Sequence, residues 1–184
     1  MAVKLSPGLV QVYTGEGKGK TTAALGLALR ALGRGLKVFM LQFLKGDDTG
    51  ELHAGKLFGD QLTIEQTGLK GFVRRGKIAL ADVQRAKEAL QRAREVLKSG
   101  DYDLVILDEI NVALYFELLS VKEVLELLQE RAPHVEVVLT GRYAPPGNHR
   151  CRGSGHRNEE HQALLSCGRA GSGRYRILNS PGSP

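Results

Sequence analysis

Apolar residues along this chain fall into two alternating patterns. Short continuous apolar runs are typical of strands buried on both faces of a sheet. Such runs predict strands over residues 9–13, 36–44, 61–66, 102–109 and 135–142. Apolar residues at helical spacing predict helices from Thr21 onward, over 81–101 and over 120–131. This alternation predicts an α/β fold in which a mostly parallel sheet lies between helical layers.

Local signals mark the ends of several predicted elements. Gly100 is placed to cap the C-terminus of the helix over 81–101. Ser120 and Glu123 have the spacing of a capping box, which predicts a helix start at Ser120. Residues 45–56 predict a loop or a frayed helix, and the glycines and basic side chains of residues 67–77 predict a loop.

The segment YTGEGKGKTT, residues 13–22, joins the first predicted strand to the first predicted helix. A phosphate-binding loop lies at this position in nucleotide-binding α/β proteins, but here three residues instead of four separate Gly15 from Gly19. Lys20 would reach the outer phosphates, and the Thr21 hydroxyl would bind Mg²⁺. A glycine-rich turn with solvated lysines is the alternative. The predicted nucleotide-binding residues are Gly15, Glu16, Gly17, Lys18, Gly19, Lys20, Thr21 and Thr22.

A second motif, LVILDE, ends in the carboxylates of Asp108 and Glu109. The apolar residues 104–107 predict a buried strand that delivers this pair to the carboxyl end of the sheet, where open α/β sheets bind ligands. Alone, such a pair is usually a solvated loop start. Beside a phosphate loop, one carboxylate is better placed to bind Mg²⁺ directly or through water. The two motifs together predict ATP or GTP binding, and the N-K-x-D motif with which GTPases read their base is absent from the sequence.

Composition narrows the class of protein. No apolar run reaches the length of a membrane span, and no secretory signal opens the chain, so we expect a cytoplasmic protein without membrane contact. The net charge is +6, but residues 147–184 hold six arginines against two glutamates, a net of +4 that leaves +2 for the rest. Because the body of the chain is nearly neutral, charge does not predict a nucleic-acid partner.

Five segments, taken in order, resemble the P-loop-type corrinoid adenosyltransferases, the ATP:cob(I)alamin enzymes. They are VYTGEGKGKTTAALGLALRALGRG, VFMLQFLKG, a glycine–phenylalanine segment at 68–72, SGDYDLVILDEIN and VLTGRYAPP. The family's phosphate loop is itself the short form, G-x-G-K-G-K-T-T, which matches GEGKGKTT here. The resemblance implies that residues 1–146 form a P-loop NTPase-like, RecA-like domain with three αβα layers.

The resemblance also implies a chemistry. Co(I) of a reduced corrinoid, cob(I)alamin or a precursor such as cobyrinic acid diamide or cobinamide, attacks the ribose C5′ of ATP. Triphosphate leaves, and an adenosylated corrinoid forms in adenosylcobalamin biosynthesis or salvage. The protein would be an alkyl transferase that needs Mg²⁺ (or Mn²⁺), receives Co(I) from a flavin-dependent reductase, and forms a homodimer.

Site residues follow from the resemblance position by position. Lys18 and Lys20 would neutralise the leaving triphosphate, and Arg142 in TGR resembles a family arginine near the phosphates, the alternative being a solvated arginine at a strand end. Thr21 and Glu109 are the candidates to bind Mg²⁺, and Asp108 ranks second. The catalytic residues that the resemblance implies are Lys20, Phe72 and Arg142.

Phe72 resembles the aromatic residue that packs against the corrinoid and helps to remove its lower axial ligand. A simple loop anchor is the alternative role for this side chain. Two positions later the family has a tryptophan, where this chain has Arg74.

Other functions remain open on the residues alone. A different P-loop ATPase or kinase would use the same two motifs. A carrier that holds adenosylated corrinoid without turnover would keep the same binding residues.

The resemblance stops at about Pro146. Residues 147–184 show neither a helical nor a strand period. If each codon is read one base later, residues 159–164 allow R-S-I-K-H, residues 174–178 allow G-I-E-F, and the next position allows a stop codon. These strings resemble the family's C-terminal turn and last strand, so we expect residues 147–184 to be an out-of-frame translation of a helix and a strand.

Overall fold

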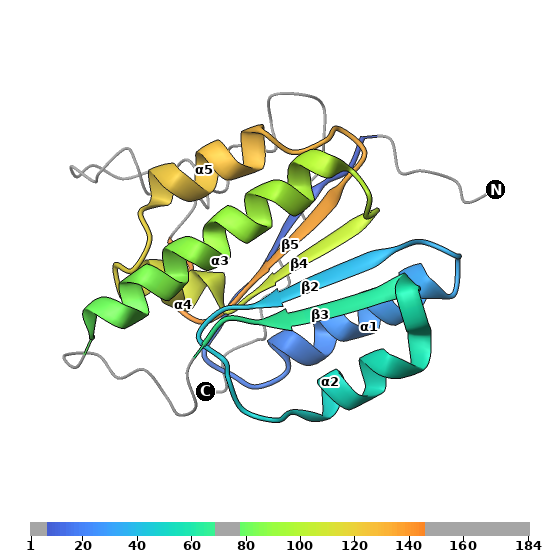
Figure 1. The fold of residues 1–184 in the computed structure, drawn as a ribbon, viewed down its shortest axis with the longest axis horizontal. Coiled ribbons are helices and arrows are strands. Elements are labelled where there is room, and N and C mark those ends of the chain that lie inside the picture. The colour runs from blue at the N-terminus through green and yellow to red at the C-terminus, as the bar shows by residue number, and fades with distance from the viewer. Residues whose placement is uncertain (1–6, 69–77, 146–184) are drawn as a thin grey trace, which may run out of the picture.

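A parallel sheet forms the centre of the protein (Figure 1). The computed structural model describes residues 7–68 and 78–145. Within them the sheet has five strands in the order β1-β5-β4-β2-β3, and every pairing is parallel. The strands are β1 (Val10–Tyr13), β2 (Val38–Gln42), β3 (Leu62–Gln66), β4 (Leu104–Asp108) and β5 (Glu136–Thr140).

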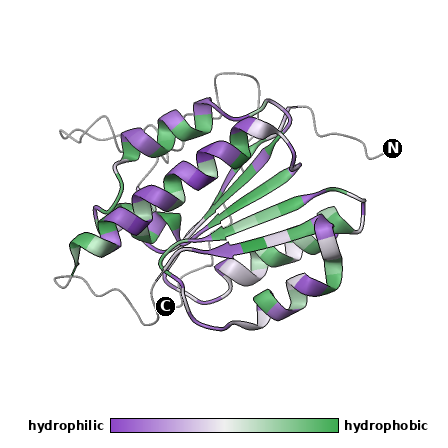
Figure 2. Ribbon diagram, viewed as in Figure 1, coloured by the Kyte–Doolittle hydropathy of each residue, from purple (hydrophilic) through white to green (hydrophobic). Residues whose placement is uncertain are grey.

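Helices cover both faces of this sheet, so the predicted three layers are confirmed (Figure 1). Helix α1 (Lys20–Leu32) packs on one face, where Ala24 and Ala28 belong to the same buried cluster as the strand side chains Met40 and Ile106. The helices of the other face share a larger cluster with the strands. They are α3 (Leu80–Ser99), α4 (Ile110–Tyr115) and α5 (Val121–Gln129). Figure 2 shows mostly apolar strands beside α3, whose visible surface is largely polar.

Most predicted elements are present, with ends shifted by a few residues. Gly100 caps α3 with a φ of 66°, and Ser120 accepts a hydrogen bond from the Glu123 N–H at the start of α5. Within 45–56, residues Gly50–Gly55 form helix α2, followed by the 3₁₀ helix η1 (Lys56–Gln61). Helix α4 was not predicted. None of the described helices is both long and apolar enough to cross a membrane.

The strand order decides where the two motifs lie. Because all strands are parallel, their carboxyl ends share one edge of the sheet. There β5 lies between β1, which leads into the phosphate loop, and β4, which ends in Asp108. The end of β5 therefore bridges the two motifs. Among the described residues β1 pairs with β5 alone, so β1 is an edge strand of this part of the chain.

Candidate functional site

The predicted phosphate loop forms an open turn between β1 and α1. Gly15 and Gly19 have φ values of 128° and 103°, which residues with a Cβ rarely adopt. Gly19 is also the N-cap of α1. A Cβ built on Gly15, Gly17 or Gly19 would meet no other atom within 4 Å. The loop backbone thus borders open space at the positive end of a helix dipole, which is the arrangement that binds phosphate groups.

Lys20 lies over this loop. Its Nζ donates to the carbonyl oxygen of Gly15 at 2.7 Å and also to that of Gly17. Burial lowers the pKa of Lys20, and the positive charge of Arg142 lowers it further, against a smaller opposing effect of Glu109. The two hydrogen bonds hold the Lys20 ammonium at the loop. There it is close enough to Arg142 and Glu109 for both charges to affect its pKa.

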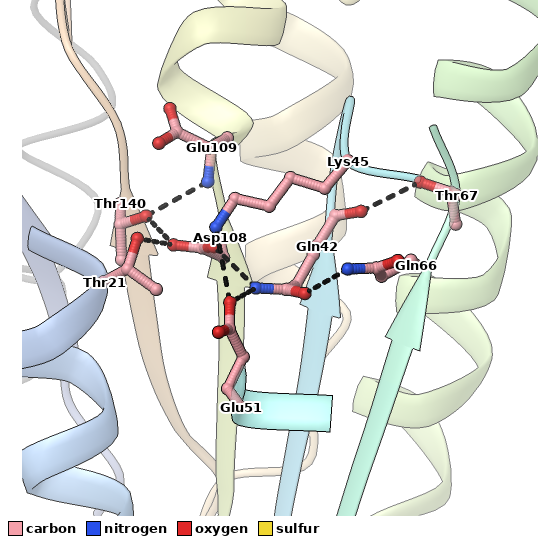
Figure 3. A network of polar contacts seen from close by, with 9 residues as sticks. All are labelled: Thr21, Gln42, Lys45, Glu51, Gln66, Thr67, Asp108, Glu109 and Thr140. Atoms are coloured by element: carbon pink, nitrogen blue, oxygen red, sulfur yellow. Dashed lines mark hydrogen bonds and ion pairs between the residues drawn. The ribbon is translucent and has the colours of Figure 1, made fainter. Parts of the chain in front are cut away.

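Asp108 is the centre of the site and is fully buried (Figure 3). Its Oδ1 accepts hydrogen bonds from the hydroxyls of Thr21 at 2.9 Å and Thr140 at 2.6 Å. Its Oδ2 accepts from Gln42 Nε2 at 3.1 Å and from Lys45 Nζ at 2.8 Å. Four donors thus hold this carboxylate, which joins the first turn of α1 to the ends of three strands.

Glu109 differs from Asp108 in both backbone and environment. Its φ of 63° is unusual for a residue with a side chain, and its N–H donates to Thr140 Oγ1 at 3.0 Å. Its carboxylate points away from Asp108 and accepts no hydrogen bond from any described residue (Figure 3). Burial, then the Asp108 charge, raises the pKa of Glu109, while Lys45, Lys20 and Arg142 partly offset this effect. Glu109 is therefore the carboxylate that can accept a cation.

The structure brings together most of the residues that the motifs singled out. Lys20, Thr21, Asp108, Glu109 and Arg142 meet at the carboxyl edge of the sheet. The remaining loop residues Glu16, Lys18 and Thr22 are exposed. Phe72 and Arg74 lie outside the described residues.

Four further residues of the site carried no site prediction: Gln42, Lys45, Glu51 and Thr140. Gln42 is fully buried inside an apolar strand run, and Thr140 is equally buried at the end of β5. A polar side chain in such a run must find partners, because an unsatisfied buried polar group is costly. That rule could have flagged Gln42 and Thr140 as neighbours of the acidic pair, but it could not have identified which groups they contact.

Fold and site together define a P-loop-type nucleotide-binding protein. The sequence matches the family described as ATP:corrinoid adenosyltransferase BtuR/CobO/CobP over residues 6–149. It is 40% identical over 140 residues to a corrinoid adenosyltransferase of Sinorhizobium sp, a match that covers 74% of this chain and 65% of that protein. It is 38% identical over 141 residues to a corrinoid adenosyltransferase of Pseudomonas aeruginosa (76% and 69%) and 36% identical over 136 residues to one of Escherichia coli K12 (73% and 68%).

The chain belongs to the ATP:corrinoid adenosyltransferase family. Enzymes of this family transfer the adenosyl group of ATP to a corrinoid, so ATP and a corrinoid are the substrates that membership implies. The chain spans about two thirds of the length of these curated relatives.

Proposed function

We propose that this protein transfers the 5′-deoxyadenosyl group of ATP to Co(I) of a reduced corrinoid, cob(I)alamin or a precursor such as cobyrinic acid diamide or cobinamide, and releases triphosphate. The observation that carries this proposal is the meeting of the short phosphate loop, with its lysines Lys18 and Lys20, with Arg142 and Glu109. The Glu109 carboxylate accepts no hydrogen bond from the described residues. Those are the groups needed to hold a polyphosphate leaving group. The reaction would serve adenosylcobalamin biosynthesis or salvage.

The step needs no nucleophile from the protein. The electron pair of Co(I) forms the Co–C5′ bond, the C5′–O bond breaks, and its electron pair leaves with triphosphate. The charge that develops on the leaving oxygen is the charge that the protein can stabilise. Lys20 lies on the phosphate loop, and Arg142 is close enough to Lys20 to lower its pKa. We infer that these two side chains, with Lys18, bind and neutralise the triphosphate while the loop N–H groups fix its position.

A divalent cation fits the described donors. The Glu109 carboxylate is free of described hydrogen bonds, and oxygen ligands are those that Mg²⁺ and Mn²⁺ prefer. We propose that Glu109 and the Thr21 hydroxyl hold Mg²⁺ (or Mn²⁺), which would neutralise phosphate charge. Asp108 is the weaker candidate for direct binding, because both of its oxygens already accept hydrogen bonds. We expect Asp108 to act on the metal through Thr21.

One assay separates this proposal from its rivals. The chain is incubated with ATP, Mg²⁺ and chemically reduced cobalamin, and the products are analysed for a light-sensitive Co–C bond and for triphosphate. Both products in equal amounts are expected. ADP or orthophosphate without the Co–C bond would instead indicate a P-loop ATPase or kinase. Corrinoid binding without turnover would indicate a carrier.

Several finer features of the family stay proposals for this chain. We propose that Phe72 packs against the corrinoid, that a flavin-dependent reductase supplies Co(I), and that the protein is a cytoplasmic homodimer. Replacement of Phe72 by alanine should slow the reaction that starts from cob(II)alamin more than the one that starts from chemically reduced cob(I)alamin. Equal slowing of both would contradict a role in removing the lower ligand.

We also propose that residues 147–184 are an out-of-frame translation of a helix and an edge strand. The family match ends at residue 149, and β1 has a strand partner on one side only among the described residues. An edge strand of this kind is a site for pairing and aggregation. A chain with the reading frame restored after residue 146 should therefore melt higher and aggregate less. Independent reads of the genomic DNA with an open frame for the present tail would refute the proposal.

A further inference from the structure

Lys45 follows β2 in a tightly fixed turn. Leu44, just before it, has a φ of 60°, which is costly for a residue with a branched side chain. The N–H of Gly68 donates to the Lys45 carbonyl oxygen at 2.7 Å. A Cβ on Gly68 would lie 2.4 Å from Leu44 C and 2.4 Å from Lys45 N, so only glycine allows this approach. Strain that the surrounding structure holds in place is characteristic of functional positions.

The turn directs the Lys45 side chain across the strand ends to Asp108 (Figure 3). Lys45 Nζ lies 2.8 Å from Asp108 Oδ2 and 3.7 Å from Glu51 Oε1. Gln42 Nε2 donates to the same two oxygens, at 3.1 Å and 2.9 Å. One ammonium and one amide thus hold two carboxylates together that would otherwise repel each other.

The orientation of the Gln42 amide follows from its partners. Its Oε1 accepts a hydrogen bond from Gln66 Nε2 at 2.9 Å, and both neighbours of its Nε2 are carboxylate oxygens. Only the NH₂ group can face two carboxylates. Gln42 and Lys45 therefore occupy Asp108 Oδ2 from the β2 side and leave Oδ1 to the hydroxyls of Thr21 and Thr140.

From Asp108 the contacts continue to Thr21 and Glu109, the two groups proposed to hold the divalent cation. Thr140 donates to Asp108 and accepts from the Glu109 N–H, so it fixes the unusual backbone of Glu109. Thr21 donates to the same carboxylate oxygen, so a lone pair of its hydroxyl remains for another partner. Lys45 is thus connected through Asp108 to both Thr21 and Glu109, although the structure gives it no bond to either.

We propose that Lys45 is a positioning residue for the nucleotide site: it holds Asp108 so that Thr21 and Glu109 bind the divalent cation of MgATP together. This inference rests on the proposed function for the identity of the cation site. It assigns Lys45 a role through Asp108 and not a direct contact with triphosphate. Because 26% of the Lys45 side chain is exposed, direct contact is the alternative that the experiment must separate.

The test uses the full chain and inorganic triphosphate, with affinity measured by calorimetry with and without Mg²⁺. Lys45→Met should weaken triphosphate binding in the presence of Mg²⁺ about 10–100-fold, the usual cost of losing a residue that orients metal ligands. Without Mg²⁺ the affinity should stay within about twofold of the unmodified chain, since no ligand to the phosphates is lost. Lys45→Arg, which keeps the charge, should recover most of the loss.

The control is Lys122→Met, which removes an exposed lysine paired with Glu126 on α5 and should leave both affinities unchanged. Equal weakening by Lys45→Met with and without Mg²⁺ would show direct triphosphate contact and overturn the inference. No weakening, or an unmodified chain that gains no triphosphate affinity from Mg²⁺, would overturn it too. If Lys45→Met does not fold, Lys45→Gln replaces it, and the same changes in triphosphate affinity are expected with and without Mg²⁺. The binding test contains no corrinoid. A failed adenosyltransferase assay would therefore not change its result, and the two proposals can fail separately.

Discussion

Gly68 offers a direct way to move the Lys45 turn without removing any polar group of the site. A Cβ at Gly68 would lie 2.4 Å from Leu44 C, 2.4 Å from Lys45 N and 2.6 Å from Lys45 C. All three are backbone atoms, so no side chain can rotate away. Ordinary contact begins near 3.4 Å, so in Gly68→Ala the backbones of Gly68 and of Leu44–Lys45 must move apart by about 1 Å.

A shift of this size has two expected costs. Overpacking of this kind destabilises a protein by about 1–3 kcal/mol, which corresponds to roughly 2–12 °C in Tm for a chain of this length. A displacement of about 1 Å at a positioning group can lower activity by about 100-fold. We therefore expect Gly68→Ala to lose about 10–100-fold in kcat/KM for MgATP in the adenosylation assay, beyond its loss of stability.

Gly8→Ala is the matched control. A Cβ at Gly8 would lie 2.3 Å from the C and O atoms of Val135, also backbone, but at the amino end of the sheet, opposite the site. Tm is measured by circular dichroism, and activity is measured well below both transitions. Both variants should lose stability, and only Gly68→Ala should lose activity. Unchanged activity in Gly68→Ala, or an equal loss in Gly8→Ala, would refute the reasoning.

The remaining predictions concern individual side chains of the site. Lys20→Met should lower kcat about 100–1000-fold, measured as triphosphate release, because a charge that stabilises the leaving group is lost; a change below tenfold would contradict that role. Thr140→Val should lower the free energy of unfolding by about 1–3 kcal/mol in urea, since the part-buried Glu109 N–H loses its acceptor; unchanged stability would contradict it. Glu109→Gln should abolish most of the Mg²⁺ dependence yet raise Tm at pH 7. Burial raises the pKa of Glu109, so its ionised form costs folding free energy above that pKa and the cost vanishes in acid, where both states are protonated. The Tm gain should therefore shrink toward pH 4, and a gain that grows in acid would refute the sign.

The phosphate loop was accessible from sequence because its chemistry is local. Gly15, Gly19, Lys20 and Thr21 are close in the chain, and their spacing alone predicts a backbone that turns toward an anion. The buried strands were accessible for a similar reason, since each is a continuous apolar run. Helix α4 was missed because its six residues, Ile110–Tyr115, are too few to show a helical period next to an apolar strand.

The contacts of Asp108 were not accessible in this way. Its partners Thr21, Gln42, Lys45 and Thr140 are separated from it by 87, 66, 63 and 32 positions. Their meeting depends on the strand order β1-β5-β4-β2, which places three strand ends around one carboxylate. The resemblance ranked Glu109 above Asp108 as a metal ligand, and the fold supplies the physical reason: Asp108 accepts four hydrogen bonds, whereas the Glu109 carboxylate accepts none from the described residues.

By itself, the sequence determined the class of fold, the phosphate loop and the resemblance to corrinoid adenosyltransferases, because each depends on patterns within short segments and on the order of those segments along the chain. The tertiary structure decided which role each of the two carboxylates, Asp108 and Glu109, has at the site. Only the parallel register of β4 with β2 and β5 brings Lys45, Gln42 and Thr140 to Asp108, and a buried carboxylate takes its role from the groups that the fold places around it.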